Sequence, residues 1–366
     1  MTRLVAVGDL VLGDSATSPG FGFNSRYSID GLAEPFEGVQ AALAAGDIVF
    51  GNLEAVLATS GLDNRRHHTV HMRGAVRYAA DLKAAGFTVL NLANNHANQH
   101  GDDAFREMCG HLQAAGLAVC GLPGSDGWRT RPVVVNGPDG GTVGLLGYSL
   151  HPRQYFPDRP PPFAEAAPEE ILGEIGRLRA EVTHVVVSVH WGFEFVTAPS
   201  AEEVGLGRAM LRAGASVVLG HHPHVVRPVE QSADGIIAYS LGNLVSDMLW
   251  APAVRTGLIL ECRLRREGPE EAVLTGTRLD NRYRVFPTGT RAAVPPSAIR
   301  PIETAEYRRT ATAAERVMRR RKYRHLLASL PSVDWSLAAQ MVAGVVRGRL
   351  RNQDRLNPDR QGGSVG

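Results

Sequence analysis

The sequence predicts an α/β fold in which buried strands alternate with amphipathic helices. Short apolar runs bounded by turn residues, such as the run at residues 4–7 before Gly8 and Asp9, are typical of strands buried on both faces of a sheet. Segments with apolar residues at helical spacing stand between most of these runs. Strands joined by helices are usually parallel with right-handed crossovers. We therefore expect a layered α/β domain with some added antiparallel strands.

The expected elements follow in chain order. Buried strands are predicted at residues 4–7, 48–50, 88–92, 117–120, 185–189, 217–219 and 236–240. Helices are predicted at residues 35–45, 76–85, 102–115, 169–180 and 201–213. Gly86 and Gly116 end two of these helices, since glycine readily adopts the left-handed conformation at a C-cap. Residues 132–135 and 142–146 should form a hairpin over NGPDGG, and strands near 257–264 and 272–280 should close the domain.

Composition and charge limit the class of protein. The chain has 366 residues, of which 44% are hydrophobic and 21% charged, as in ordinary globular proteins. The formal net charge of +2 gives no sign of a nucleic-acid or membrane partner. Cys109, Cys120 and Cys262 are too widely spaced for a zinc finger, and three cysteines cannot all pair. The first residues enter a strand without a signal-like segment, so we expect a cytoplasmic protein without a membrane partner.

One stretch concentrates the chemistry of the chain. An apolar run ends in Gly220, and three histidines follow within four residues: His221, His222 and His224. His222 and His224 are separated by one residue, so in an extended segment their rings point the same way. Two neutral imidazoles directed at one point suit a divalent metal. The alternative is a surface loop that happens to be rich in histidine.

Polar side chains also follow the carboxyl ends of the other expected strands. In open α/β sheets this edge is where ligands bind. The side chains are carboxylates, amides and imidazoles, the types that ligate hard-to-borderline divalent ions. Taken singly, each has an ordinary interpretation as a turn cap, a solvated carboxylate or a core histidine. The residues that share this position are Asp9, Glu54, Asn95, His96, His190, His222, His224 and Asn243.

This set is larger than one tetrahedral ion requires. Two ions bridged by a carboxylate would use all of it, lower the pKa of bound water and stabilise an anionic transition state. A single ion would still polarise a carbonyl oxygen. His96 follows an amide ligand and need not bind metal itself, which makes it a candidate general acid. Asp9 is the second residue expected to take part in catalysis.

Six motifs carry a family resemblance. In chain order they are GDLVLGD, GNLEAVL, NLANNHANQHG, VVVSVHWGFEF, VVLGHHPHVVRPVE and AYSLGNLVSD. They resemble the CapA family, named for poly-γ-glutamate capsule synthesis, which is similar to the calcineurin-like metallophosphoesterases. The resemblance covers about residues 3 to 265. It implies a four-layer α/β/β/α sandwich with a divalent-metal centre at the strand ends. The ligands that it implies are Asp9, Glu54, Asn95, His190, His222 and His224, with His96 as the neighbouring acid.

Two positions depart from the family pattern. Val11 stands where the phosphoesterases usually have a histidine, so a complete two-metal site is in doubt. Gln99 stands where the family usually has an aspartate after the NNH motif, which alters a contact beside the site. The expected cofactor is therefore one or two divalent ions, with Mn, Zn, Ca, Co and Fe all left open. Substrate contacts are expected from Arg73, Trp191, Asn243 and His221.

The C-terminal part lies outside the family pattern. We expect a domain over residues 1–290, a helical extension over 300–351 and a disordered tail over 352–366. A helix at 305–329 carries Arg316, Arg319, Arg320, Arg321, Lys322 and Arg324, and a second helix is expected at 335–350. The basic block is either a solvated face or a contact for an acidic or peptide partner. Few aromatic residues surround it, which makes nucleic acid a poor fit.

The expected function is a cytosolic, divalent-metal-dependent, hydrolase-like enzyme. It would act on a peptide or other amide-bearing substrate, or on a phosphoester, by metal-activated water or a metal-polarised carbonyl. The first alternative is a peptide epimerase of a modified-peptide pathway, of the lasso type for example, which removes and returns a Cα proton. The second is a metal-stabilised binding protein without catalytic activity.

Overall fold

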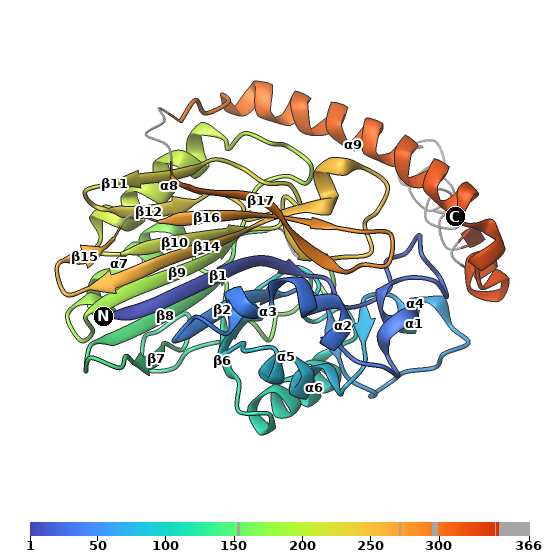
Figure 1. Cartoon of the computed structure of the whole chain (residues 1–366), viewed down its shortest axis with the longest axis horizontal. Helices are drawn as coiled ribbons and strands as arrows, with labels where there is room; N and C mark the ends of the chain where they lie inside the picture. Colours follow the sequence, from blue (N-terminus) through green and yellow to red (C-terminus); the bar gives the residue numbers. More distant parts are fainter. Residues whose placement is uncertain (152–153, 271, 295–298, 341, 344–366) are drawn as a thin grey trace, which may run out of the picture.

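A computed structural model describes residues 1–151, 154–270, 272–294, 299–340 and 342–343. Most of the strands form two sheets that pack face to face (Figure 1). The first sheet has the order β17-β16-β14-β1-β2-β5-β6, with β13 beside β1 and β15 beside β14. The second sheet has the order β11-β12-β10-β9-β8-β7.

The strands of the first sheet are β1 (Thr2–Leu10), β2 (Ile48–Leu53), β5 (Val89–Asn91), β6 (Ala118–Cys120), β13 (Asn243–Val245), β14 (Thr256–Arg265), β15 (Gly268–Pro269), β16 (Val273–Leu279) and β17 (Val285–Ala293). Those of the second are β7 (Val133–Asn136), β8 (Thr142–Ser149), β9 (His184–His190), β10 (Val217–His221), β11 (Val229–Ser232) and β12 (Gly235–Ala238). A separate parallel pair joins β3 (Val56–Leu57) to β4 (Arg73–Gly74).

Strand direction follows the sequence expectation. The neighbours β1, β2, β5 and β6 are parallel, and so are β8, β9, β10 and β12. The expected hairpin is present as the antiparallel pair β7 and β8. Antiparallel β14, β16 and β17 extend the first sheet, and β17 reaches Ala293, past the expected domain boundary at residue 290.

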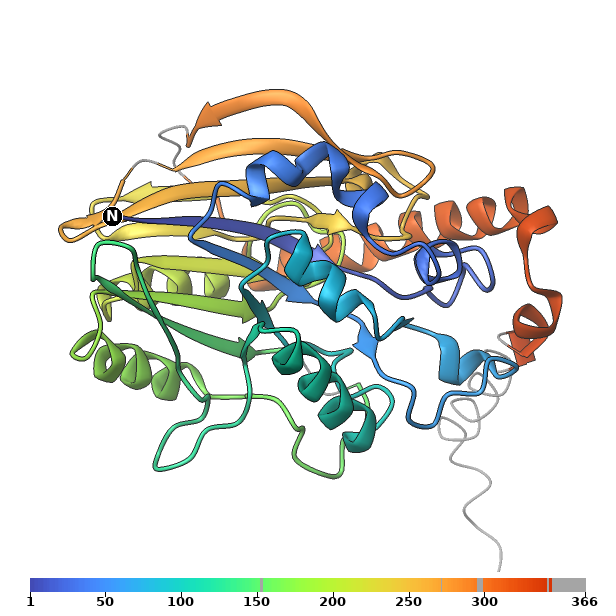
Figure 2. The ribbon, with the colours of Figure 1, turned by 60° about the horizontal axis from the view of Figure 1, so that its bottom comes forward.

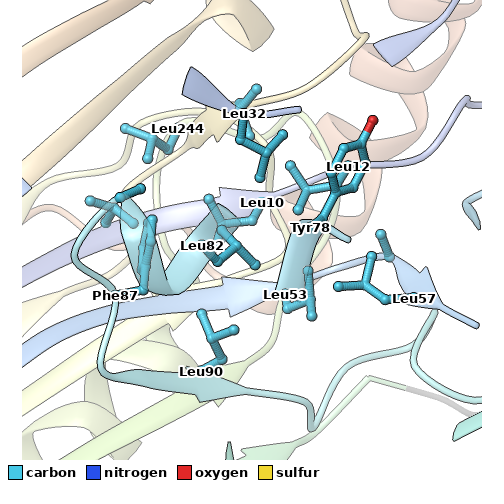
Figure 3. Close-up of a cluster of buried hydrophobic side chains, with 14 of the residues drawn as sticks. Leu10, Leu12, Leu32, Leu53, Leu57, Tyr78, Leu82, Phe87, Leu90 and Leu244 are labelled. Atoms are coloured by element: carbon cyan, nitrogen blue, oxygen red, sulfur yellow. The ribbon is translucent and has the colours of Figure 1, made fainter. Parts of the chain in front are cut away.

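Alternating side chains create the layers. In β1, Leu4 and Ala6 point into the core between the two sheets, while Val5 and Val7 point to the opposite face. That opposite face is covered by α5 (Tyr78–Ala84) and α6 (Asp102–Ala114), whose buried side chains join the cluster drawn in Figure 3. On the second sheet, Val185 and Val187 face α7 (Pro168–Arg179) and α8 (Ala201–Arg212). The expected α/β/β/α sandwich is therefore confirmed.

One expected helix differs in detail. Instead of one helix over residues 35–45, the chain forms α2 (Ala33–Phe36), a 3-10 turn η1 (Glu37–Val39) and α3 (Gln40–Leu43). Gly38 allows this segment to lie close to β17, because a Cβ there would lie 2.4 Å from the carbonyl oxygen of Val285. The segment therefore follows the edge strand β17 rather than its own helical periodicity. Periodicity within one segment cannot report such a distant neighbour.

Sequence reasoning missed the edge strand β17 and several short elements. The short elements include α1 (Phe23–Tyr27), α4 (His67–Val70), and the 3-10 turns η2 (Pro252–Arg255) and η3 (Leu330–Ser332). No helix among the described residues is both long enough and apolar enough to cross a membrane.

The helical extension begins with α9 (Thr304–Ala328), as expected. It runs along the outside of the molecule toward the carboxyl ends of the central strands (Figure 1). After α9 the chain turns back toward α4, as Figures 1 and 2 both show. There Gln340 donates a hydrogen bond to the carbonyl oxygen of Arg65. Residues 335–340 and 342–343 are helical, and the rest of the second expected helix and the tail at 352–366 lie outside the described residues.

Candidate metal centre

The expected ligands meet where the carboxyl ends of both sheets adjoin. In the first sheet Asp9 at the end of β1 pairs in register with Asn243 of β13, and Glu54 directly follows β2. In the second sheet His190 at the end of β9 pairs with His221 at the end of β10. Parallel strands within each sheet carry these residues to one edge.

Glu54, His222 and His224 form the centre of the group. Each offers one ligand atom, and the three atoms all lie within 4.8 Å of one another. All three residues are buried. Both carboxylate oxygens of Glu54 and Nδ1 of His222 have no hydrogen-bond partner among the described residues. Burial of such atoms is costly unless something binds them, so their chemistry fits a divalent cation.

The pKa values of Glu54 and His224 are both raised. Burial, together with the charges of Asp9 and Glu194, raises the pKa of Glu54 well above its ordinary value. Burial lowers the pKa of His224, but the charges of Glu54 and Asp9 and a hydrogen bond to Asp9 outweigh it and raise the pKa to about 10. The carboxylates therefore create a site for positive charge. A divalent ion bound to Glu54 and His224 would supply that charge directly.

Asp9 is the most heavily contacted carboxylate of the site. It accepts hydrogen bonds from Nδ2 of Asn52 at 2.9 Å and from the backbone N–H of His222 at 3.3 Å. Its oxygens also lie 3.3 Å from Nδ1 of His221 and 3.4 Å from Nδ1 of His224. Burial opposes ionisation of Asp9, but these imidazoles outweigh it and hold the pKa well below its usual range. Asp9 is thus an anion at neutral pH.

His190 and Asn95 contact each other at the side of the group. Nε2 of His190 lies 2.8 Å from Oδ1 of Asn95 and 3.9 Å from Oε1 of Glu54. The amide of Asn95 in turn donates to Gln154 at 3.0 Å. Burial lowers the pKa of His190 and of His222 well below the ordinary value, so both rings are neutral. Neutral imidazole is the form that ligates metal.

His96 lies at the rim of the site. Its side chain is 15% exposed, and its Nε2 is 3.9 Å from Oε1 of Glu54. Nδ1 donates to Oε1 of Gln99 at 2.8 Å, so Nε2 is the nitrogen that faces the centre. Burial lowers the pKa of His96 to about 4. Gln99, which replaces the family's usual aspartate, therefore orients the ring without adding a negative charge.

The backbone at the histidine motif is strained. His222 has φ of 95° and His224 has φ of 55°, both in the left-handed region that non-glycine residues rarely adopt. The expected extended segment is therefore wrong at these two positions, although both rings still reach the centre. Strain of this kind is usually found at functional sites, where the surrounding structure stabilises it.

Two of the residues expected to contact substrate use their donors for backbone carbonyls. Arg73 is buried, and its guanidinium donates to the backbone carbonyls of Thr69, Ala58 and Ser60 at 2.8, 2.6 and 2.6 Å. It therefore fixes the 58–74 loop instead of facing a ligand. Trp191 packs against α8, its indole N–H donates to the carbonyl oxygen of Tyr239 at 3.1 Å, and its side chain also borders a cavity.

The other two expected substrate contacts lie behind the ligands. Asn243 accepts from Nδ1 of His224 at 2.9 Å and donates to the carbonyl oxygen of Val254 at 2.9 Å. His221 faces Asp9, and both residues are fully buried. Asn243 and His221 thus orient the ligand side chains and do not line a substrate surface.

Three residues at the site were missed. His151 follows β8, and its ring centroid lies 4.2 Å from that of His222. Asn52 in β2 links Asp9 to the Nδ2 donor of Asn91. Glu194, in the loop after β9, acts through its charge on Glu54, His96 and His224. We selected His190 because it follows the expected carboxyl end of a strand. The same criterion selects His151 when the end of β8 is placed at Ser149.

Comparisons with known proteins agree with the motif pattern. Residues 3–248 match the family model described as Bacterial capsule synthesis protein PGA_cap. PGA biosynthesis protein CapA of Bacillus subtilis (strain 168) is 30% identical over 262 residues, which are 71% of this chain and 66% of that protein. Capsule biosynthesis protein CapA of Bacillus anthracis is 29% identical over 273 residues, 72% of this chain and 64% of that protein. The chain thus spans just under two thirds of the length of these curated relatives.

Among solved structures, the calcineurin-like phosphoesterase YfkN from Bacillus subtilis is similar with a TM-score of 0.42 and 12% identity. The similarity covers 89% of this chain and 99% of that one.

Proposed function

The chain belongs to the family of bacterial capsule synthesis proteins described as PGA_cap, and we propose that it is a divalent-metal-dependent enzyme acting on an amide or phosphoester bond. One observation carries this proposal. Glu54, His222 and His224 bring three potential ligand atoms within 4.8 Å of one another in a buried site, and both oxygens of Glu54 lack a hydrogen-bond partner among the described residues.

The residues divide into ligands and supporting groups. Glu54, His222 and His224 would hold the metal, with Asp9 and His190 as further ligands on the two flanking strands. When bound, a divalent ion lowers the pKa of water and polarises a carbonyl or phosphoryl oxygen. Asn243 holds the ring of His224 through Nδ1, which leaves Nε2 directed at Glu54. Such contacts around a ligand usually tune metal affinity.

His96 is the group proposed to move a proton. Its Nε2 faces the centre, the ring is partly exposed, and the pKa of about 4 leaves it neutral at physiological pH. A neutral imidazole can accept a proton from water and return it to a leaving amine or alkoxide. Gln99 keeps Nδ1 occupied, so the proton is exchanged at Nε2.

The substrate class is proposed from the chemistry of the site together with the relatives. The relatives are named as PGA and capsule biosynthesis proteins. We place an amide-bearing, peptide-like substrate first and a phosphoester second. Cys109, Cys120 and Cys262 are unpaired, which fits the proposed cytoplasmic location; fractionation of cells that express the protein tests it.

The first experiment combines metal analysis with two assays. Protein purified without an affinity tag is analysed for Mn, Fe, Co, Zn and Ca. It is then given a chromogenic phosphodiester and a set of peptides, each with and without chelator. Hydrolysis that disappears with chelator and returns with one metal supports the proposal. Full activity after complete metal removal would refute it.

A second candidate is peptide epimerisation, and one observation favours it. Two imidazoles stand beside the proposed metal ligands: His96 faces Glu54, and the ring of His151 lies 4.2 Å from that of His222. A pair of bases beside a polarised carbonyl suits removal and return of a Cα proton. In D2O an epimerase adds deuterium at Cα without adding water to the peptide, whereas a hydrolase adds the mass of one water. A non-catalytic binding protein shows neither, and loses only thermal stability with chelator.

A further inference from the structure

The helix α9 has one face on the protein body and one face toward solvent. The inward residues recur at helical spacing, and the buried Tyr307 begins the series. Met318 packs beside Trp250, and Nζ of Lys322 lies 5.2 Å from the centre of the Trp250 ring. The ring of His325 lies 6.4 Å from that of Phe21. These contacts at both ends and in the middle fix which side of the helix faces outward.

The outward face is densely cationic. The helix contains eight of the 39 Lys and Arg residues and two of the 37 acidic residues, so it carries a formal charge of +6 and leaves −4 on the rest of the chain. No ion pair joins the arginines of this face to another described residue. We call this face the arginine face; its exposed members are Arg308, Arg309, Arg316, Arg319, Arg320, Arg321 and Arg324.

The arginines also repel one another. Arg316, Arg320 and Arg324 follow at spacings of four residues, at which like charges on a helix are destabilising. A partner with negative charges would remove this repulsion and release counterions from the surface. Exposed apolar side chains stand between the cations, with Val317 50% and Leu327 64% exposed. The face thus offers both charged and apolar contacts.

We propose that the arginine face of α9 binds an acidic polypeptide segment in an extended conformation. Nucleic acid is less suited to this face, because bases need aromatic platforms and Tyr323 is the one exposed aromatic residue on the helix. This inference concerns binding and goes beyond the proposed chemistry.

A cavity beside the first turn of α9 favours a polypeptide over other polyanions. It has a volume of about 510 Å3, and its walls include Leu150, Phe193, Leu206 and Arg308. Leu150 directly precedes His151, and Phe193 directly precedes Glu194, so the cavity adjoins the loops that carry these two side chains to the metal centre. A peptide held by acidic side chains on the arginine face can place an apolar side chain in this cavity.

The length of the face sets the length of the expected ligand. Arg308 and Arg324 are separated by roughly 24 Å along the helix at its usual rise per residue. An extended chain covers that distance with about eight residues. Affinity should therefore increase with peptide length up to about eight residues and then level off.

The experiment measures binding of fluorescent peptides to the full-length protein by anisotropy. The probes are peptides of four, eight and twelve residues that alternate Glu with Leu, and matched peptides with Gln in place of Glu. The test variant is Arg316→Gln/Arg319→Gln/Arg320→Gln. The control removes the same charge elsewhere, with Arg65→Gln/Arg106→Gln/Arg263→Gln, whose arginines lie on other elements and pair with Asp63, Asp103 and Glu270.

We expect the acidic peptides to bind more weakly as salt increases, because exposed charges are screened. The test variant should lose about ten-fold in affinity, since three exposed ion pairs are each worth about a factor of two. The control variant should lose less than two-fold. Equal binding of the Gln peptides, or an equal loss in the control, overturns the proposal. Tighter binding of a single-stranded oligonucleotide or of vesicles with anionic lipid also overturns it.

The same titration with His222→Ala separates this inference from the proposed function. Unchanged peptide binding by that variant is expected, because His222 lies in the metal centre and not on α9. If the protein proves to have no metal-dependent activity, the peptide-binding experiment still tests this inference independently.

Discussion

Nε2 of His224 lies 3.7 Å from Oε1 of Glu54, although the two residues follow strands of different sheets. Both side chains are buried, and the pKa of each is raised. A carboxylate buried without hydrogen bonds is expensive in free energy. A bound cation would compensate this carboxylate where the two sheets meet, which is the physical basis for the proposed metal centre.

Replacement of Glu54 by Gln should stabilise the metal-free protein. The substitution removes a carboxylate whose pKa is raised by burial, at a gain of about 2 kcal/mol. The measurement is the unfolding free energy in excess chelator. With metal present the unmodified protein should be the more stable of the two, because Glu54→Gln loses a ligand. Glu169→Gln on the exposed start of α7 is the control; a loss of stability in both conditions for Glu54→Gln would contradict this interpretation.

The substitutions His222→Ala and His190→Ala should each abolish metal retention and leave the fold intact. Each removes a neutral imidazole from the buried group. Metal content after dialysis, with circular dichroism as the check on folding, measures the effect. His111→Ala removes a histidine from the surface of α6 and should retain the metal content of the unmodified protein. Full occupancy in either site variant would refute the ligand assignment.

His96→Gln should separate catalysis from metal binding. The ring is proposed to exchange a proton and not to bind metal, so kcat should fall by about 10² to 10⁴ while metal content is unchanged. His100→Gln is the comparison, since His100 lies nearby and contacts the carbonyl oxygen of His71 at 2.8 Å. Loss of metal from His96→Gln would show that His96 is a metal ligand.

Asp14 should make the stability depend on pH. Its carboxylate accepts hydrogen bonds from the backbone and hydroxyl of Ser25, but burial raises the pKa to about 6. A pKa raised in the folded state favours folding at low pH, and this contribution is lost as pH increases from about 4 through 6. Asp14→Asn should therefore be more stable than the unmodified protein at pH 8, by about 3 kcal/mol.

At pH 4 the difference between Asp14→Asn and the unmodified protein should disappear. Urea unfolding at both pH values measures it, with Asp30→Asn on the surface as the control. A stability difference that is equal at pH 4 and pH 8 would show that the Asp14 carboxylate does not titrate in this range.

Tyr307→Phe should loosen the start of α9. The hydroxyl accepts from Nη2 of Arg227 at 2.6 Å and from the backbone N–H of Phe193 at 3.1 Å. Its loss removes one partner of the buried Arg227 and the partner of the Phe193 N–H, at about 1 kcal/mol. Hydrogen exchange in residues 304–328 should become faster, whereas Tyr323→Phe on the exposed face should have no effect. Unchanged exchange in Tyr307→Phe would mean that apolar packing alone holds the helix.

Much of the layered fold could be predicted because apolar periodicity is local. The central strands of both sheets and most of the helices follow from the spacing of residues such as Val5 and Val7 in the printed sequence, whereas the edge strand β17 was not predicted. The close approach of Gly38 to the backbone of Val285 could not be predicted in the same way, since the two residues are far apart in the sequence.

The candidate site, like the fold, could be predicted only in part. The strand-end rule selected Asp9, Glu54, His190 and His222, because parallel strands place their carboxyl ends at one edge. It could not tell which polar side chains face the centre. Arg73 and Trp191 look suitable for ligands in sequence, yet their donors are used by backbone carbonyls. His151 was missed because its strand is longer than the apolar run that predicts it.

The sequence by itself determined the kinds of ligand and the strand ends that carry them, since both depend on residue type and short spacing. Only the tertiary structure decided that Glu54, from one sheet, and His224, from the other, share a buried space. The reason is that the packing of the two sheets depends on side chains from the whole chain, and no local pattern contains that distance. The same packing decides that α9 turns its arginines outward.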